Sequence, residues 1–342
     1  MNGQMIIKFL KNTIFMLLAL TLILGLCFSI KADGIVTDNE QSAINALNGH
    51  YVCSINDAYQ ERYFKANIIK NLNRDVGVIS IGSSHLMTLS NDAVKGDYIN
   101  LAVGGANLQD RLNLLGLLDL YNIKYGKVVY EIDLASFLPS ARTIENYSAN
   151  FKKYGNYFYN KIVLGLNSKP TLDFDDYYVN EFFDNAILDL TRVYDKSNLP
   201  YKFIYYKPDA SQGYPKSVYE EETENKDAQT EIIINNDKSF KDIEVNQESI
   251  ITTDAIMKYF HDNGVDIHIV VVPRPPSVYD GADMLTSKYI ASINDLILKY
   301  YNNYNVKVYG SFCPHHMDVT EDDYYDALHL KPDSITRLYT IN

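Results

Sequence analysis

A serine, an imidazole and a carboxylate occur in this chain in contexts that suit one hydrolytic site. Asp326 stands three residues before His329, and far upstream Ser84 closes a Gly-Ser-Ser turn after a run of strand-forming residues. A serine hydroxyl becomes an effective nucleophile when a base takes its proton and a carboxylate orients that base. Folding brings such residues together, so their separation in sequence is no objection. We therefore predict Ser84 as nucleophile, His329 as general base and acid, and Asp326 as the orienting group.

The surrounding residues predict buried strands that alternate with helices. Five short runs are rich in β-branched residues and lack polar alternation, as in strands buried on both faces. These runs are 76–81, 98–103, 127–132, 267–272 and 306–309. Helical patterns lie between several of them, which favours an α/β fold with a mainly parallel sheet covered on both sides. Ser84 follows the first strand and Gly105 the second, at the carboxyl ends where such sheets bind ligands.

The stretch from about 146 to 249 fits this alternation poorly. It contains an aromatic run near 154–159, a predicted helix at 178–194 and a predicted strand at 231–234. We interpret it as an insertion or lid within an α/β domain that spans residues 74–342.

The N-terminal residues predict a membrane anchor. Two lysines precede the uncharged segment 13–30, which has about the length of a membrane-spanning helix and carries the positive charge on its leading side. We assign residues 1–32 to this anchor, and 33–73 to a membrane-proximal stalk that leads into a helix near 58–72. The expected location is the cell membrane, with one pass, the N-terminus inside and the remainder outside. Cleavage of the signal would instead give a secreted protein.

Charge and cysteine content exclude some partners and cofactors. The net charge of −12, without a sustained basic run, argues against nucleic acid. Cys53 and Cys313 are too few for a disulfide framework, although an exported location permits one bridge between them. No cofactor and no metal are expected, because no Cys/His cluster has suitable spacing. A metal-dependent hydrolase is the weaker alternative, with His315, His316, Asp326 and His329 as its ligands.

The two motifs together resemble the SGNH or GDSL-type hydrolases. Gly82-Ser83-Ser84 matches the first, Gly-Asp-Ser block of that family at the Gly and the final Ser, and Asp326 to Pro332 matches its Asp-x-x-His block. The resemblance covers about 76–105 and 326–332. It implies a three-layer α/β/α sandwich with a flavodoxin-like sheet, the three catalytic roles given above, and the N–H groups of Ser84 and Gly105 as oxyanion donors.

One block departs from the family pattern. An Asn normally follows the third strand and completes the oxyanion hole, but residues 130–136 contain none. Loss of one such donor costs roughly a hundredfold to a thousandfold in rate, unless Asn107 or Ser136 replaces it. His85, next to the nucleophile, and Arg274, after the fourth strand, are further candidates for substrate contact. Arg274 would suit an anionic glycan.

Exported family members that combine Gly-Ser-Ser with an N-terminal anchor are associated with teichoic-acid D-alanylation and with polysaccharide acylation. The resemblance therefore implies a bacterial esterase or acyltransferase that forms an acyl-Ser84 intermediate on cell-envelope glycans. Its substrate would be an envelope polysaccharide or a teichoic-acid-like polymer, and a membrane-bound acyltransferase is a candidate partner. The alternative is a catalytically inactive SGNH-like protein that binds glycans or assists envelope assembly, which the missing Asn favours.

Overall fold

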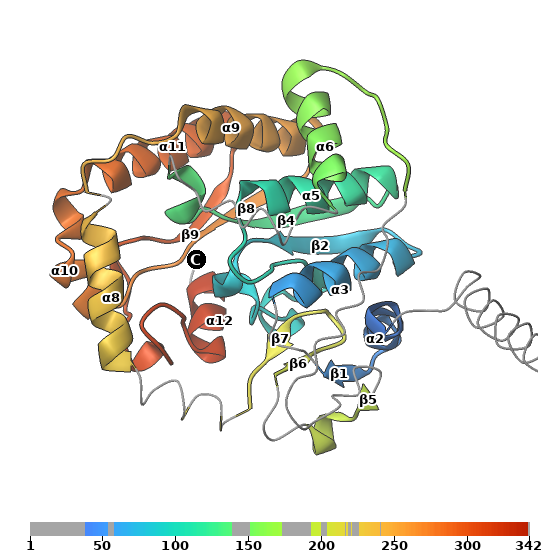
Figure 1. Ribbon diagram of the computed structural model, residues 1–342, viewed down its shortest axis with the longest axis horizontal. Helices are drawn as coiled ribbons and strands as arrows, with labels where there is room; N and C mark the ends of the chain where they lie inside the picture. The colour runs from blue at the N-terminus through green and yellow to red at the C-terminus, as the bar shows by residue number, and fades with distance from the viewer. Residues whose placement is uncertain are drawn as a thin grey trace, which may run out of the picture. The chain divides into compact units, whose positions relative to one another are not determined.

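A five-stranded parallel sheet lies at the centre of the protein (Figure 1). The computed structural model describes residues 38–53, 58–138, 151–172, 193–199, 204–215, 217, 220, 226–239 and 241–340. The sheet has the order β3-β2-β4-β8-β9. Its strands are β2 (Val76–Ile81), β3 (Tyr98–Asn100), β4 (Tyr125–Glu131), β8 (Asp266–Val271) and β9 (Lys307–Gly310). Each strand overlaps one of the five predicted runs, so the predicted α/β class with a mainly parallel sheet is confirmed.

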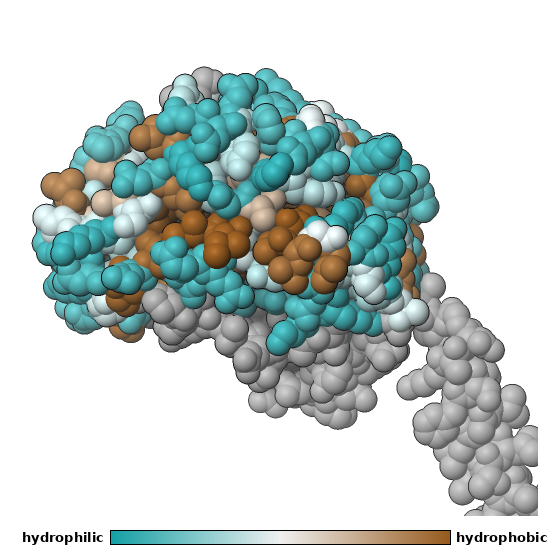
Figure 2. All heavy atoms as spheres, turned by 90° about the horizontal axis from the view of Figure 1, so that it is seen from above, coloured by the Kyte–Doolittle hydropathy of each residue, from teal (hydrophilic) through white to brown (hydrophobic). Residues whose placement is uncertain are grey.

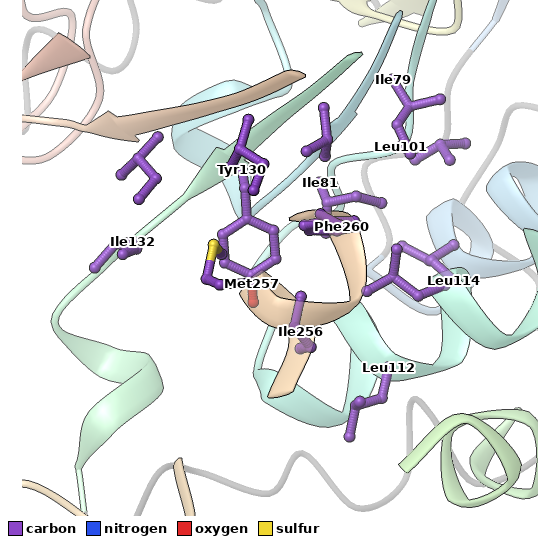
Figure 3. Close-up of a cluster of buried hydrophobic side chains, with 14 of the residues drawn as sticks. Ile79, Ile81, Leu101, Leu112, Leu114, Tyr130, Ile132, Ile256, Met257 and Phe260 are labelled. Atoms are coloured by element: carbon purple, nitrogen blue, oxygen red, sulfur yellow. The ribbon is translucent and has the colours of Figure 1, made fainter. Parts of the chain in front are cut away.

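Apolar side chains cover both faces of this sheet. Ile79, Ile81 and Tyr130 point to one face and pack in the main core with helices such as α5 (Leu108–Leu120) and α9 (Gln247–Asp262) (Figure 3). Alternate residues of the strands point the other way and pack in a second cluster. This second cluster includes α4 (Asn91–Val94) and α12 (Pro332–Thr340). Burial on both faces explains why the strands read as nearly continuous apolar runs.

Further helices complete the main core. α6 (Lys152–Leu164) lies beside α5, and α11 (Lys288–Tyr304) lies beside α9 (Figure 1). The aromatic run near 154–159 falls within α6, where Tyr154, Tyr157 and Phe158 are buried against the core. On the face seen in Figure 2 the surface is mostly hydrophilic, with apolar patches between the polar side chains.

The segment predicted as a stalk contributes to the folded unit, which spans Asn39–Asn342. It forms α2 (Asp38–Leu47), β1 (Tyr51–Cys53) and α3 (Ala58–Asn71), the last of which matches the helix predicted near 58–72. Apolar side chains of α2 and α3 belong to the main core, so the described part of this segment is not a stalk. The predicted anchor, 1–32, lies outside the described residues. Among the residues that are described, no helix is long and apolar enough to cross a membrane.

A small antiparallel sheet of order β5-β1-β6-β7 joins the N-terminal segment to the predicted insertion. Its other strands are β5 (Val193–Tyr194), β6 (Tyr205–Tyr206) and β7 (Gln212–Gly213). Val193 and Tyr194 pair with β1, so the predicted helix at 178–194 is wrong at its end, and the rest of it lies outside the described residues. Cross-strand pairing with a distant segment decides this structure, which local periodicity does not report.

The strand predicted at 231–234 is also wrong. These residues lie within α8 (Lys226–Lys238). Ile234 packs toward Gly281 of α10 (Pro276–Gly281), where an added Cβ would approach its side chain to 2.7 Å. Ile233 faces the cavity described below. Tertiary packing on two sides of a helix therefore overrides the β-propensity of the isoleucine run.

Candidate active site

Ser84 lies just beyond the carboxyl end of β2. It is the first residue of the short 3-10 helix Ser84–Leu86, so its N–H has no partner within that helix. The buried Asn100, at the end of β3, holds the same turn. Its amide donates to the carbonyl oxygens of Leu86 and Leu89, each at 2.8 Å. Two neighbouring strand ends thus fix the backbone around Ser84.

Ser84, His329 and Asp326 form one continuous chain of hydrogen bonds. The Oγ of Ser84 lies 2.8 Å from Nε2 of His329. Nδ1 of His329 lies 2.6 Å from Oδ2 of Asp326. Because the carboxylate accepts the proton on Nδ1, Nε2 is left to accept the proton of Ser84. The three residues that the sequence singled out are thus placed in the order that a catalytic triad requires.

The loop before α12 holds the Asp326 carboxylate in place. Its Oδ1 accepts the backbone N–H groups of Leu328 and His329 at 2.8 and 2.6 Å. Burial raises the pKa of Asp326, but the hydrogen bond to the His329 ring, the charge of that ring and the two N–H groups together lower it below its ordinary value. The ring of Tyr325 stacks on that of His329, with centroids 5.6 Å apart. The imidazole is therefore constrained on its edge and on one face.

A buried glutamate holds the loop after β2. Glu131, at the end of β4, accepts the N–H of Ser83, and its Oε1 accepts the Ser83 hydroxyl at 3.0 Å. The same Oε1 lies 2.7 Å from Nδ1 of His85. Gly82 is required here, because an added Cβ would approach Oε2 of Glu131 to 2.6 Å. The Gly-Ser-Ser turn is thus shaped around this carboxylate.

Arg111 balances the negative charge behind this loop. Its guanidinium donates to the backbone carbonyl of Glu131 and to the carboxylate of Asp133. Burial raises the pKa of Glu131, but the hydrogen bond and charge of His85, the charge of Arg111 and the Ser83 N–H lower it to about 2. The Glu131 carboxylate is therefore ionised at neutral pH, even though it is fully buried.

A second buried glutamate holds the loop after β3. Glu61, from α3, accepts the N–H of Gly104 at 2.7 Å, and the neighbouring Arg62 donates to the Gly104 carbonyl at 3.2 Å. In a trans peptide the C=O and the following N–H point in opposite directions. Because Arg62 binds the carbonyl from one side, the N–H of Gly105 is directed to the other side. Gly105 itself has φ of +58°, which glycine adopts at no steric cost.

The same network reaches the start of α5. Arg62 donates to both carboxylate oxygens of Asp110, at 2.8 and 2.6 Å. Asp110 and Asn107 form a reciprocal capping box at the N-terminus of that helix. Asn107 therefore uses its side-chain oxygen for the cap, and its amide nitrogen is the group left for a ligand.

These loops surround a cavity of about 530 Å³. Of the predicted site residues, it is lined by Ser84, His85, Gly105, Asn107, Arg274 and His329. Asp326 lies behind His329, as an orienting group should. Ser136 does not line the cavity: its N–H and its hydroxyl donate to Asp133 at 2.8 and 2.9 Å. Of the two substitutes predicted for the missing Asn, Asn107 lines the cavity and Ser136 does not.

Arg274 lies in the cavity wall and forms an ion pair with Asp237 of α8. The nearest atoms, Nε and Oδ2, are 3.1 Å apart, and the carboxylate is buried. Burial raises the pKa of Asp237, and the charge and hydrogen bond of Arg274 oppose that rise. The pair ties the predicted insertion to the loop after β8.

The weaker, metal-dependent alternative finds no support in the described part of the chain. No group of three or more His, Cys, Asp or Glu there has the geometry to hold a metal ion. His315 instead contacts Asp280 on the surface at 2.8 Å. Cys53 and Cys313 are both buried, and no bridge joins the two.

Several supporting residues were not identified from the sequence. Glu131 had a signal, because a charged residue in a strand that reads as buried on both faces demands a partner. Glu61, Arg62 and Asp237 had none, because they reach the site from helices that are distant in sequence. No family model, curated protein or solved structure matches this chain.

Proposed function

We propose that this protein is an SGNH-like serine esterase or acyltransferase that acts on acyl esters of cell-envelope glycans. The observation that carries the proposal is the chain of hydrogen bonds from Ser84 through His329 to Asp326. When the five strands are numbered by their order in the sequence, they lie side by side in the sheet in the order 2-1-3-4-5, which is the order of flavodoxin-like sheets. In such sheets ligands bind where the order reverses, here between β2 and β4, which is where Ser84 lies.

In the proposed reaction the Ser84 oxygen attacks the ester carbonyl carbon while His329 takes its proton. The N–H groups of Ser84 and Gly105 face the developing oxyanion, and the Asn107 amide is placed to assist them. The alcohol part of the ester departs and leaves an acyl-Ser84 intermediate. Attack by water then gives hydrolysis, whereas attack by a sugar hydroxyl gives transfer.

The composition of the cavity wall supports an acylated sugar as substrate. Its apolar side chains suit an acyl group, and the Arg274–Asp237 pair offers polar contacts to a sugar or to an anionic group on it. The apolar lining residues include Leu134, Leu138, Ile233 and Phe312. We further propose that segment 13–30 anchors the enzyme so that the catalytic domain meets envelope polymers outside the cell.

The test is covalent labelling of the full-length protein with a fluorophosphonate probe. An activated Ser84 oxygen displaces fluoride from phosphorus, so wild type is expected to be labelled. Ser84→Ala and His329→Ala should each reduce labelling by about 10⁴-fold or more. Matched controls are Ser292→Ala and His315→Ala, which change an exposed serine and an exposed histidine outside the cavity. A folded wild type that is not labelled would contradict the proposal and favour the glycan-binding alternative.

A further inference from the structure

The cavity contains a second imidazole with a carboxylate partner. His85 follows the nucleophile directly, and its ring centroid lies 5.3 Å from that of His329. Both rings line the same cavity. His85 Nδ1 contacts Glu131 at 2.7 Å, just as His329 Nδ1 contacts Asp326 at 2.6 Å. Each histidine is thus held through Nδ1, and Ser84 lies beside both.

The partners of Glu131 define which His85 nitrogen is available to a substrate. Glu131 is ionised and acts only as an acceptor, and the Ser83 hydroxyl already donates to the oxygen that His85 contacts. Nδ1 of His85 must therefore carry a proton, which leaves Nε2 as the other functional nitrogen.

The buried charges behind the His85 ring are not balanced by Arg111 alone. Within the described part of the chain, two buried carboxylates, those of Glu131 and Asp133, face a single buried guanidinium, that of Arg111. The cluster therefore has one negative charge in excess before His85 is counted. A buried excess charge is unfavourable unless it is paired. The His85 ring, in contact with Glu131, is a group that can carry the balancing positive charge when both of its nitrogens hold protons.

We propose that His85, oriented by Glu131, is the acid–base residue for the oxygen that leaves or enters, while His329 handles only the proton of Ser84. This inference rests on the proposed function. One histidine, His329, would exchange a proton with Ser84, and the other, His85, would exchange a proton with the leaving or entering oxygen.

The proton transfers balance in both steps. In acylation, His329 Nε2 takes the Ser84 proton as that oxygen bonds to the acyl carbon. The ester C–O bond then breaks, and the departing oxygen takes a proton from His85 Nε2. In deacylation, water or a sugar hydroxyl gives a proton to His85 Nε2 and bonds to the acyl carbon. The Ser84 Oγ–acyl bond then breaks, and Ser84 recovers its proton from His329.

This division predicts that the need for His85 depends on the leaving group. A p-nitrophenolate ion leaves without a proton, whereas an alkoxide does not, so only an alkyl ester needs an acid in the first step. The test compares p-nitrophenyl acetate with ethyl acetate in the full-length protein and in His85→Gln. With p-nitrophenyl acetate the acylation burst should be unchanged, while steady-state turnover falls by about 10²- to 10⁴-fold.

With ethyl acetate, acylation itself should slow by a similar factor. Imidazole added to His85→Ala should restore deacylation, because a free base can replace the missing ring. His329→Gln should lose both the burst and turnover, and His315→Gln, with a surface imidazole removed, should lose neither. The rescue experiment also separates the loss of a base from a structural defect in the variant.

Three results would overturn the inference alone. They are an equal fall in burst and turnover, no fall in either, and a turnover defect that imidazole does not relieve. A folded wild type that never acylates Ser84 would overturn the proposed function as well, so the two failures are distinguishable.

Discussion

The loops after β2 and β3 are built in the same way but differ in their charge balance. In each loop a buried glutamate from another element accepts a backbone N–H, that of Ser83 in one and Gly104 in the other. A glycine lies beside each carboxylate. Glu131 has a pKa that is lowered to about 2, whereas burial raises the pKa of Glu61 in spite of its hydrogen bonds to Gly104 and Gln212 and the nearby charges of Lys65 and Arg62.

The difference shows that burial alone does not determine whether the pKa of a carboxylate is raised or lowered. The negative charge of Glu131 is stabilised by contact with His85 and by the guanidinium of Arg111, so this charge contributes to the electrostatic field near Ser84. Glu61 serves chiefly to hold a peptide group in one orientation. The two loops should therefore respond differently to the same substitution, and each prediction below applies one change to both.

The largest effect is expected from removing the charge of each glutamate. Glu131→Gln leaves three donors, the Ser83 N–H, its hydroxyl and His85, facing an amide that can accept fewer bonds. It should lower the free energy of unfolding by about 3–5 kcal/mol, as for a broken buried ion pair. Glu61→Gln should cost about 1–2 kcal/mol, because an amide oxygen can still accept the Gly104 N–H. Urea unfolding measures both. Equal losses would refute the distinction between the loops.

A smaller effect is expected from adding a methyl group to each glycine. In Gly82→Ala the new Cβ would meet Oε2 and Cβ of Glu131 at 2.6 and 2.8 Å. The backbone must then shift, at about 1–3 kcal/mol, and the labelling rate of Ser84 should fall with it. In Gly104→Ala the new Cβ meets only the end of the Glu61 side chain, at 2.8 Å, which can move. Thermal melting should rank Gly82→Ala as the less stable variant, and the opposite order would contradict this account.

The smallest effect concerns pH. The folded-state pKa of Glu131 lies below its ordinary value of 4.5, so its contribution to stability is present above that pH and is lost as pH falls toward 2. Glu61 has a raised pKa, so its contribution is present below 4.5 and is lost as pH rises through the raised value.

The measurement is the melting temperature between pH 2 and pH 7. Glu131→Gln should flatten the acid side of the wild-type curve, because it removes the carboxylate that must be protonated there. Glu61→Gln should flatten the side toward neutral pH. If the Glu61 variant changed only the acid side of the curve, that result would contradict a raised pKa for Glu61.

Much of the fold follows from local sequence, because buried parallel strands need continuous apolar residues. Residues 76–81 were predicted with the same bounds as β2. The failures occurred where distant contacts decide the structure: Val193 and Tyr194 became a strand by pairing with β1, and 231–234 became helical by packing on α10. The segment predicted as a stalk, 33–73, contains folded helices because apolar side chains of α2 and α3 pack in the main core. Its local composition does not reveal this packing.

The same distinction between local sequence signals and distant contacts applies to the residues of the candidate site. Ser84, Asp326 and His329 carried recognisable motifs, and the structure joins them by hydrogen bonds. Ser136 follows β4, as the sequence predicts, but its hydroxyl donates a hydrogen bond to Asp133. Sequence spacing alone does not show this contact. Glu61 and Arg62 reach the Gly104 loop across more than 40 residues, with separations of 43 and 42. Their role follows only from tertiary structure.

The separation of the triad along the chain also governs when the site can form during synthesis. Ser84 and His329 are 245 residues apart, and Glu61 meets Gln212 across 151. Contacts this distant close late, because the loop entropy between them must first be overcome. A nascent chain that has not yet reached residue 329 carries Ser84 without its hydrogen-bond partner His329. Under the proposed function, Ser84 of such a nascent chain is not yet activated, and its reactivity begins only after His329 has been synthesised and folded into place.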